Sequence, residues 1–187
     1  MMKKMALVMM AMLLVTGVAM AKEIGGKNLP DSLAAGNDTL VLNGGGLRVK
    51  WFMDIYAGGL YTKAKTQDAT KLIEADESMA IKVHIISGLM NDKKMEDALR
   101  EGFEKATKGN LAPIQSRIDK MIAVMKGEYK QDDVFDFVYV PEEGVSVFKN
   151  GRMLSTIKGL DFKKPLFAIW LGEEPAQEDL KQAMLGK

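Results

Sequence analysis

The chain has 187 residues, a formal net charge of +1 at neutral pH, one histidine and no cysteine. The nearly balanced charge gives no electrostatic reason to bind nucleic acid or an anionic membrane, and the lack of cysteine excludes disulfides, thiolate nucleophiles and thiolate metal sites. Stability must therefore come from a hydrophobic core, for which this length is sufficient.

The first 21 residues have the features of a secretory signal peptide. A basic start at Lys3 and Lys4 is followed by an apolar run over residues 6–20, and the small-x-small sequence AMA at residues 19–21 stands just before Lys22. A membrane anchor is the alternative, but the run is shorter than the about 20 apolar residues that span a bilayer. We expect cleavage after Ala21, which leaves residues 22–187 as a single domain, periplasmic or secreted, with no membrane span in the mature chain.

Residues 39–61 alternate like β-strands, and the glycines at 44–46 and 58–59 indicate turns, bulges or close backbone approach. The alternation predicts two faces, one with Val49, Trp51, Met53 and Ile55 and the other with Lys50, Phe52, Asp54 and Tyr56. Arg48 stands at the entrance of this aromatic run. Because a cation is rarely buried unpaired, Arg48 is either a solvated strand-end residue or a cation placed to meet an anion.

The only histidine, His84, lies in a further predicted strand, MAIKVHIIS. The chain has no G-x-S-x-G elbow for a nucleophile and no cysteine to share a zinc ion, so we interpret His84 as a strand residue with a local hydrogen bond. The segment NGGGLR lacks the G-x-x-x-x-G-K-[ST] spacing of a phosphate-binding loop. We therefore expect no metal site and no cofactor.

Helical periodicity begins at residue 91, with Asn91 or Asp92 as the N-cap. One apolar stripe contains Met95, Ala98, Leu99, Gly102, Phe103 and Ala106. After Gly109 and Asn110, a second stripe contains Ile114, Ile118, Met121, Ile122 and Met125. The two patterns predict a helical hairpin.

Strand patterns return over residues 133–159, where Asn150-Gly151 predicts a tight hairpin turn. The end of the chain predicts two short helices with Pro165 and Pro175 near their starts, closed by Gly172 and Gly186. Strands, a helix pair, strands and then helices indicate an α+β fold, with the helices on one face of an antiparallel sheet.

Three blocks of this sequence resemble the chalcone isomerase-like family, specifically its exported bacterial branch. They are LNGGGLRVKWFMDIYAGGLYT, KVHIISGLMNDKKMEDALREGFEKA and PLFAIWLGEEPAQEDLKQAMLG, in the family's order and across nearly the whole mature chain. The resemblance implies an open-faced β-sandwich, in which helices cover a long curved antiparallel sheet and a ligand cleft lies between them.

The resemblance also implies a role for Arg48. The segment GGGLR matches the family's G-x-G-x-R with Gly44, Gly46 and Arg48. In plant chalcone isomerases this arginine stabilises a developing enolate, and in the related plastid fatty-acid-binding proteins it holds the ligand carboxylate. In both roles the guanidinium donors meet an anionic oxygen.

The chain departs from the enzymes at three polar positions, one of which is a strand threonine that falls here near Ile55. Where they have a tyrosine at the start of the helix and an asparagine two turns later, this sequence has Lys94 or Met95 and then Glu101. Without those partners an anion could bind, but a polyphenol would be poorly oriented. Chalcone cyclisation is therefore not expected.

The favoured hypothesis is a non-catalytic, exported binder of a fatty acid or similar amphipathic anion, with Arg48 on the headgroup and Trp51, Phe52, Phe103 and Met121 along the tail. One alternative is an isomerase or intramolecular lyase that acts on an unknown carbonyl compound through an Arg48-stabilised enolate. Another is a structural or partner-binding domain in which these aromatic residues belong to the core.

Overall fold

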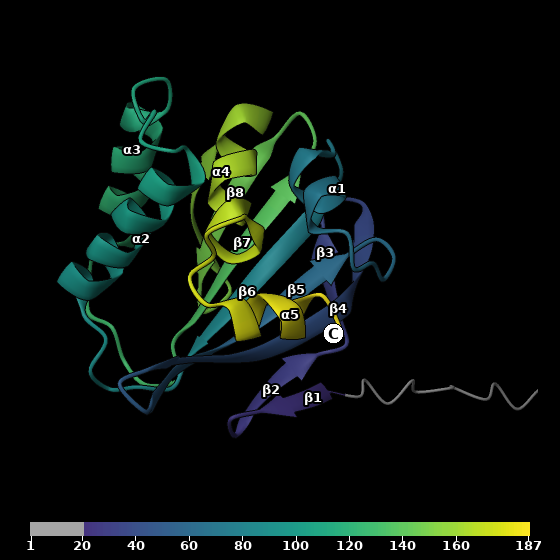
Figure 1. Cartoon of the computed structure of the whole chain (residues 1–187), viewed down its shortest axis with the longest axis vertical. Helices are drawn as coiled ribbons and strands as arrows, with labels where there is room; N and C mark the ends of the chain where they lie inside the picture. The colour runs from purple at the N-terminus through teal and green to yellow at the C-terminus, as the bar shows by residue number, and fades with distance from the viewer. Residues whose placement is uncertain (1–20) are drawn as a thin grey trace, which may run out of the picture.

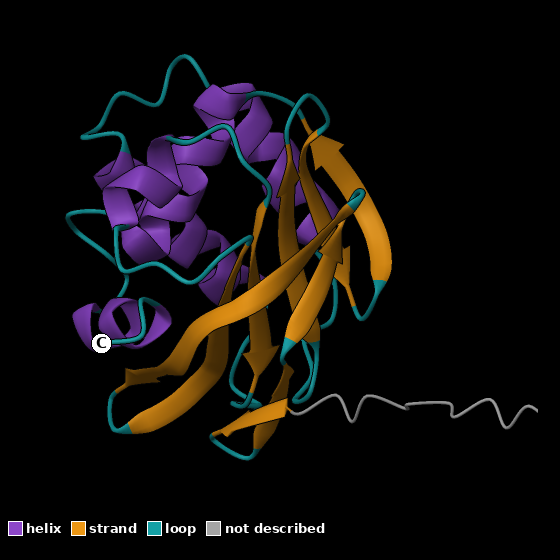
Figure 2. Cartoon of the chain, turned by 90° about the vertical axis from the view of Figure 1, so that its right-hand side faces the viewer, coloured by secondary structure: helices purple, strands orange, loops and turns teal. Residues whose placement is uncertain are grey.

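The computed structural model describes residues 21–187, so the predicted signal peptide lies outside the described residues except for Ala21. A curled sheet forms one layer and the helices cover one of its faces (Figures 1 and 2). This arrangement confirms the predicted α+β fold with helices packed on one face of a curved antiparallel sheet.

The main sheet has seven strands in the order β3-β4-β5-β6-β7-β8-β9, and each strand is antiparallel to its neighbours. These strands are β3 (Ser32–Ala35), β4 (Asp38–Lys50), β5 (Met53–Thr62), β6 (Met79–Ile85), β7 (Val134–Val140), β8 (Gly144–Lys149) and β9 (Arg152–Ile157). A separate hairpin consists of β1 (Ala21–Ile24) and β2 (Lys27–Pro30). The turn between β8 and β9 is Asn150-Gly151, as predicted, with φ of 52° and 77°.

Alternation along the strands gives the sheet two apolar faces. The helix-facing side contributes the main core, which includes Leu60, Ile81, Val83, Phe137 and Val147. The other side has a smaller cluster, in which Ile24 and Leu29 of the β1–β2 hairpin pack with Leu40, Tyr61 and Val138. The sheet is therefore covered on both faces at its β4–β5 end.

The helices are α1 (Ala69–Glu74), α2 (Asp92–Ala106), α3 (Gln115–Met125), α4 (Leu160–Leu171) and α5 (Glu178–Met184). Asn91, one of the two residues predicted for this position, is the N-cap of α2, and its side chain accepts a hydrogen bond from the backbone N–H of Lys94 at 2.9 Å. The predicted stripe of α3 is buried from Ile118 to Met125. Figure 1 shows α2 and α3 side by side, which confirms the helical hairpin.

Two predicted boundaries were wrong. The predicted alternation continued through Trp51 and Phe52 and placed them on opposite strand faces. In the structure those two residues form the turn between β4 and β5. Helix α4 begins at Leu160, five residues before Pro165, and Arg117 pairs with Asp161 in its first turn. The helix α1 and the strands β1, β2 and β3 were not predicted, because segments of four to six residues are too short to show a period.

The glycines of β4 and β5 allow close approach on both faces of the sheet. A Cβ on Gly44 would lie 2.3 Å from the carbonyl oxygen of Ala183, and one on Gly46 would lie 2.7 Å from the Cβ of Ala183. On the other face, a Cβ on Gly45 would lie 3.0 Å from a methyl group of Leu29. The triple glycine therefore lets α5 and the β1–β2 hairpin pack directly on the backbone of β4.

Candidate functional site

A cleft of about 360 Å³ lies between the sheet and helices α2 and α4. Its floor comes from β5, β6 and β7, and its walls from α2, α4 and the segment that leads into α5. The apolar lining includes Val83, Met95, Leu99, Phe135, Phe137 and Ile169. Such a space, apolar with a few polar groups, is typical of a small-molecule site.

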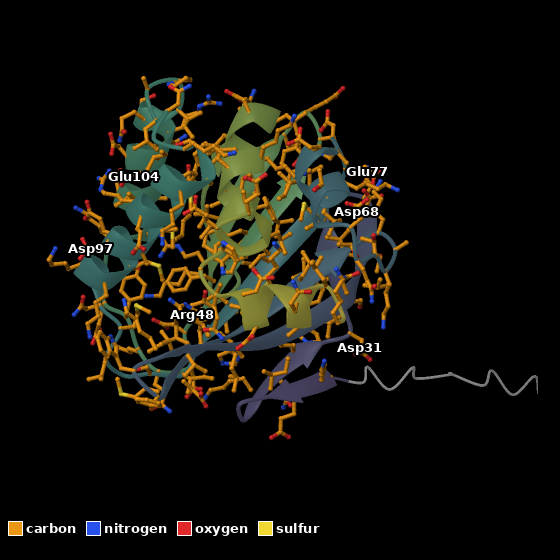
Figure 3. All side chains as sticks on the ribbon, viewed as in Figure 1. Asp31, Arg48, Asp68, Glu77, Asp97 and Glu104 are labelled. Atoms are coloured by element: carbon orange, nitrogen blue, oxygen red, sulfur yellow. The ribbon has the colours of Figure 1, made fainter. Side chains whose placement is uncertain are left out.

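Arg48 brings a cation to this cleft from the end of β4. Its Nη1 donates to the carbonyl oxygen of Val49 at 2.8 Å and to Oε1 of Gln177 at 3.0 Å. Within residues 21–187, Arg48 has no ion-pair partner, and its Nε and Nη2 donate to no other group. Since a guanidinium has five N–H donors, three remain for a ligand. Figure 3 shows Arg48 between α2 and α5.

Gln177, the residue before α5, fixes the position of the arginine. Its Oε1 also accepts from the backbone N–H of Val49 at 2.9 Å, and its Nε2 donates to the carbonyl of Leu47 at 3.3 Å. One side chain thus holds three consecutive residues of β4. Helix α5 packs on the glycines of the same strand, and Gln177 directly precedes that helix. The packing of α5 on β4 therefore also fixes the position of Gln177 and, through it, of Arg48.

Tyr56 is the cross-strand partner of Arg48 and also lines the cleft. Its hydroxyl oxygen accepts from Nε1 of Trp170 at 2.9 Å, and burial raises the pKa of this phenol. The hydroxyl therefore keeps its proton at neutral pH. It can serve as a second donor beside the guanidinium.

The α2 side of the cleft carries charges of both signs. Glu101 accepts from Lys105 Nζ at 2.6 Å, and this hydrogen bond lowers the pKa of Glu101, with Lys50 and Arg48 adding to the effect. Glu101 is therefore ionised at neutral pH. Lys94, Met95 and Glu101, which the family resemblance matched with a tyrosine and an asparagine of the enzymes, all line the cleft.

The structure brings two of the five predicted ligand residues to the cleft. Arg48 and Trp51 line it. Phe52 is fully exposed at the tip of the β4–β5 turn, whereas Phe103 and Met121 are fully buried in the core and are not lining residues. Contact of any of these residues with a ligand stays a prediction.

Three residues of the site were missed in the sequence: Tyr56, Trp170 and Gln177. Tyr56 and Trp170 are 114 residues apart, and Arg48 and Gln177 are 129 apart. The sequence did contain one indication for Tyr56, because the predicted alternation places it on the same strand face as Arg48. The structure brings the two residues together in another way, as cross-strand partners on β4 and β5. Trp170 and Gln177 had no local indication.

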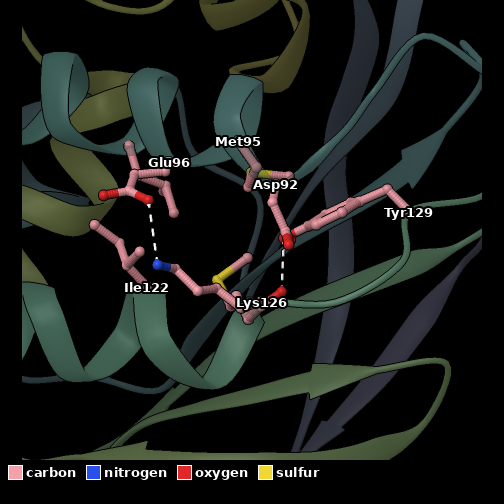
Figure 4. Close-up of a pocket in the computed structure, with 8 residues that line it drawn as sticks. Asp92, Met95, Glu96, Ile122, Lys126 and Tyr129 are labelled. Atoms are coloured by element: carbon pink, nitrogen blue, oxygen red, sulfur yellow. Dashed lines mark hydrogen bonds and ion pairs between the residues drawn. The ribbon is translucent and has the colours of Figure 1, made fainter.

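A second depression, between α2 and α3, is closed (Figure 4). It has no measurable volume for a water molecule. The carboxylate of Glu96 lies 3.6 Å from Lys126 Nζ across it, and the hydroxyl of Tyr129 donates to the carbonyl of Met125 at 2.8 Å. The pair between Glu96 and Lys126 joins α2 to the end of α3, and the depression leaves no space for a ligand.

A second cation lies deeper in the helix layer. Lys163 of α4 has no exposed surface, and its ammonium donates to the carbonyls of Leu72, Ile73 and Ala75 at 2.6, 2.9 and 2.8 Å. These carbonyls belong to the C-terminal end of α1, where the last carbonyl groups of a helix have no N–H donor within the helix itself. The ammonium of Lys163 supplies the donors. Burial lowers the pKa of Lys163 to about 8.

His84 lies on the sheet face away from this cleft. It is on β6, as predicted, with its Nε2 3.8 Å from Asp132. Burial lowers the pKa of the imidazole. No helix within residues 21–187 is both long and apolar enough to cross a bilayer.

Comparisons with known proteins agree with this architecture. A family model described as chalcone isomerase-like matches residues 21–186. Fatty-acid-binding protein 1 of Arabidopsis thaliana is 24% identical over 179 residues, a match that covers 79% of this chain and 63% of that relative's length. The crystal structure of an Arabidopsis thaliana fatty-acid-binding protein has a TM-score of 0.69 at 18% identity, covers 86% of this chain and 92% of that one, and shows the same fold.

Proposed function

The chain belongs to the chalcone isomerase-like family, and from that premise we propose that it binds a fatty acid or similar amphipathic anion in the cleft. Its similarity to a plant protein named for fatty-acid binding supports this function. The observation that carries the proposal is Arg48, a cation at the cleft with three N–H donors left over.

The headgroup of the ligand belongs at Arg48. A carboxylate accepts two parallel hydrogen bonds from a guanidinium, and the bond is stronger where water is partly excluded. Arg48 is half-buried and is held by Gln177, so little further ordering is needed when the anion arrives. The hydroxyl of Tyr56 supplies a third donor on the neighbouring strand.

The acyl chain belongs along the apolar lining between α2 and the sheet. Each methylene that is buried there contributes about 0.8 kcal/mol. We therefore expect affinity to rise with acyl length until the cleft of about 360 Å³ is full. Additional carbons beyond that point should add little.

The decisive experiment compares a fatty acid with the fatty alcohol of equal length, by calorimetry, on Arg48→Met. Methionine keeps the apolar stem and removes the donors, so affinity for the acid should fall by about 1.5 to 3 kcal/mol, roughly 10- to 150-fold. Affinity for the alcohol should hardly change. Arg152→Met, the same exchange at an exposed position of β9, is the matched control.

Equal losses for acid and alcohol would show that the variant had damaged the cleft. Unchanged affinity for the acid would remove Arg48 from the site, and no binding of any acid by the wild type would overturn the proposed function.

We also propose that the protein is exported and cleaved after Ala21. The charge and apolar pattern of the first 21 residues supports this, as does the start of the family match at residue 21. Mass spectrometry of the protein from its native host should find Lys22 as the first residue. An intact chain that begins at Met1 and sediments with membranes would contradict the proposal.

A further inference from the structure

The β4–β5 turn places two large aromatic residues where small residues are usual. Trp51 and Phe52 have φ of 55° and 62°, and their exposed fractions are 78% and 103%. A two-residue turn with both φ values positive normally uses Asn-Gly, because bulky side chains are strained there. The same chain uses Asn150-Gly151 in the β8–β9 turn. The aromatic pair therefore strains its backbone without adding to the core.

Other exposed apolar side chains adjoin this pair. Val49 and Met53, on either side of the turn, are 38% and 41% exposed, and Leu89 of the β6–α2 segment is 56% exposed. Together with Trp51 and Phe52 they form the aromatic tip. Figure 1 shows the β4–β5 turn projecting beyond the end of the sheet, near the start of α2. Trp51, Met53 and Leu89 also line the cleft, so the tip forms part of its entrance.

We propose that the aromatic tip inserts into the interfacial region of a phospholipid membrane and so brings the entrance of the cleft to the lipid surface. Tryptophan is favoured at this depth because its ring is apolar and its N–H is polar. Backbone strain that is not offset by packing in the core is common in functional segments. This inference goes beyond fatty-acid binding and does not require it.

The charges around the tip fit phospholipid headgroups. Within residues 21–187 neither Lys50 nor Lys94 has a carboxylate partner, and Lys94 Nζ instead donates to the carbonyl of Leu89 at 2.7 Å. Both lysines line the cleft beside the tip. Asp54 is the carboxylate next to the turn, so the local excess of positive charge is small. The aromatic side chains should therefore dominate the binding, and added salt should weaken it little.

The shape of the tip favours a membrane over a protein partner. A stable protein interface buries about 800 Å² on each side, with complementary surfaces. A projecting two-residue turn offers two large side chains on a narrow convex edge. A fluid lipid interface can surround such an edge without a matching cavity.

The test is co-flotation of the fatty-acid-free protein with phosphatidylcholine vesicles that contain a minor fraction of phosphatidylglycerol. Trp51→Asn combined with Phe52→Gly copies the chain's other turn, so it should fold at least as well as the wild type. We expect this double variant to lose at least about tenfold in partition coefficient, because two large apolar side chains no longer enter the lipid. Met153→Ser, at an exposed apolar position of β9, is the matched control and should float like the wild type.

A second readout locates the contact. In Trp170→Phe the remaining tryptophan is Trp51, whose emission should shift to the blue when vesicles are added. Arg48→Met should float like the wild type, which separates this proposal from the fatty-acid site. Absence of flotation by the wild type, equal flotation by the double variant, or self-association through the tip in place of lipid binding would each overturn it.

Discussion

Arg48 and Lys163 each bring a cation to the space between sheet and helices, but they use their donors differently. The ammonium of Lys163 gives all three of its protons to the carbonyls at the end of α1 and has no exposed surface. Arg48 gives one nitrogen to the protein and keeps three N–H groups free of partners among the described residues. The number of unused donors, more than the depth of burial, distinguishes a structural cation from a cation available to a ligand.

The largest effect should come from removing the structural cation. Lys163→Met leaves three carbonyls at the end of α1 without donors, and we expect the free energy of unfolding to fall by about 3 kcal/mol. At this chain length the melting temperature should drop by about 6 to 12 °C. Lys164→Met, which removes an exposed pair with Glu74, is the control and should cost at most about 1 kcal/mol. A loss below that level for Lys163→Met would remove the contrast between the two cations.

The dependence on pH should sharpen the contrast. Burial, and then the charge of Lys164, lower the pKa of Lys163 to about 8 from 10.5, against the opposing effect of Asp76, Glu74 and Glu77. Between these values the unfolded chain binds more protons than the folded one, so stability should rise with pH. The rise should be about 2 kcal/mol between pH 8 and 10. Denaturant titrations of wild type and Lys163→Met over this pH range give the rise as the difference between their free energies of unfolding. Contributions from tyrosines, which both proteins contain, largely cancel in that difference. A difference that does not change with pH would contradict the assignment.

A smaller effect concerns the ligand cation. Glu101 lines the same cleft and is ionised, so it repels an incoming carboxylate. Glu101→Gln should raise fatty-acid affinity by about 1 kcal/mol and leave fatty-alcohol affinity unchanged. Glu104→Gln, on an exposed part of α2 outside the cleft, is the control. Weaker binding of the acid by Glu101→Gln would mean that Glu101 helps to position the ligand.

The smallest effect should be that of Arg48→Met on the stability of the empty protein. The variant loses two hydrogen bonds of Nη1, but Gln177 keeps its bonds to Val49 and Leu47. The melting curve should correspond to a change of at most about 1 kcal/mol in either direction. A loss as large as that of Lys163→Met would make Arg48 part of the scaffold.

Local chemistry made much of the fold predictable. The cap at Asn91, the Asn150-Gly151 turn and the alternation of β6 each depend on neighbouring residues, and each was predicted correctly. The β4–β5 turn was not predicted, because Trp51 and Phe52 carry no turn chemistry and reach positive φ only with strain. Sequence alone gave no reason to end the strand there.

The site was predicted only in part, for a related reason. The G-x-G-x-R segment identified Arg48, but the Gln177 that holds it is 129 residues away. An apolar stripe also does not say whether a residue fills the core or lines a cleft. Phe103 and Met121 belong to the core alone, whereas Leu99, on the same helix as Phe103, belongs to the core and also lines the cleft.

The order of the strands has a consequence for the time course of folding. Each strand of the main sheet pairs only with strands adjacent in sequence, so most of the sheet can form by steps of short loop closure. The contact of Gln177 with Arg48 spans 129 residues and needs α5, near the end of the chain. During synthesis the N-terminal part can fold before that segment has emerged. We therefore expect the sheet to form first and the headgroup site to be completed last, so that a chain released before α5 would have a sheet but no anchored arginine.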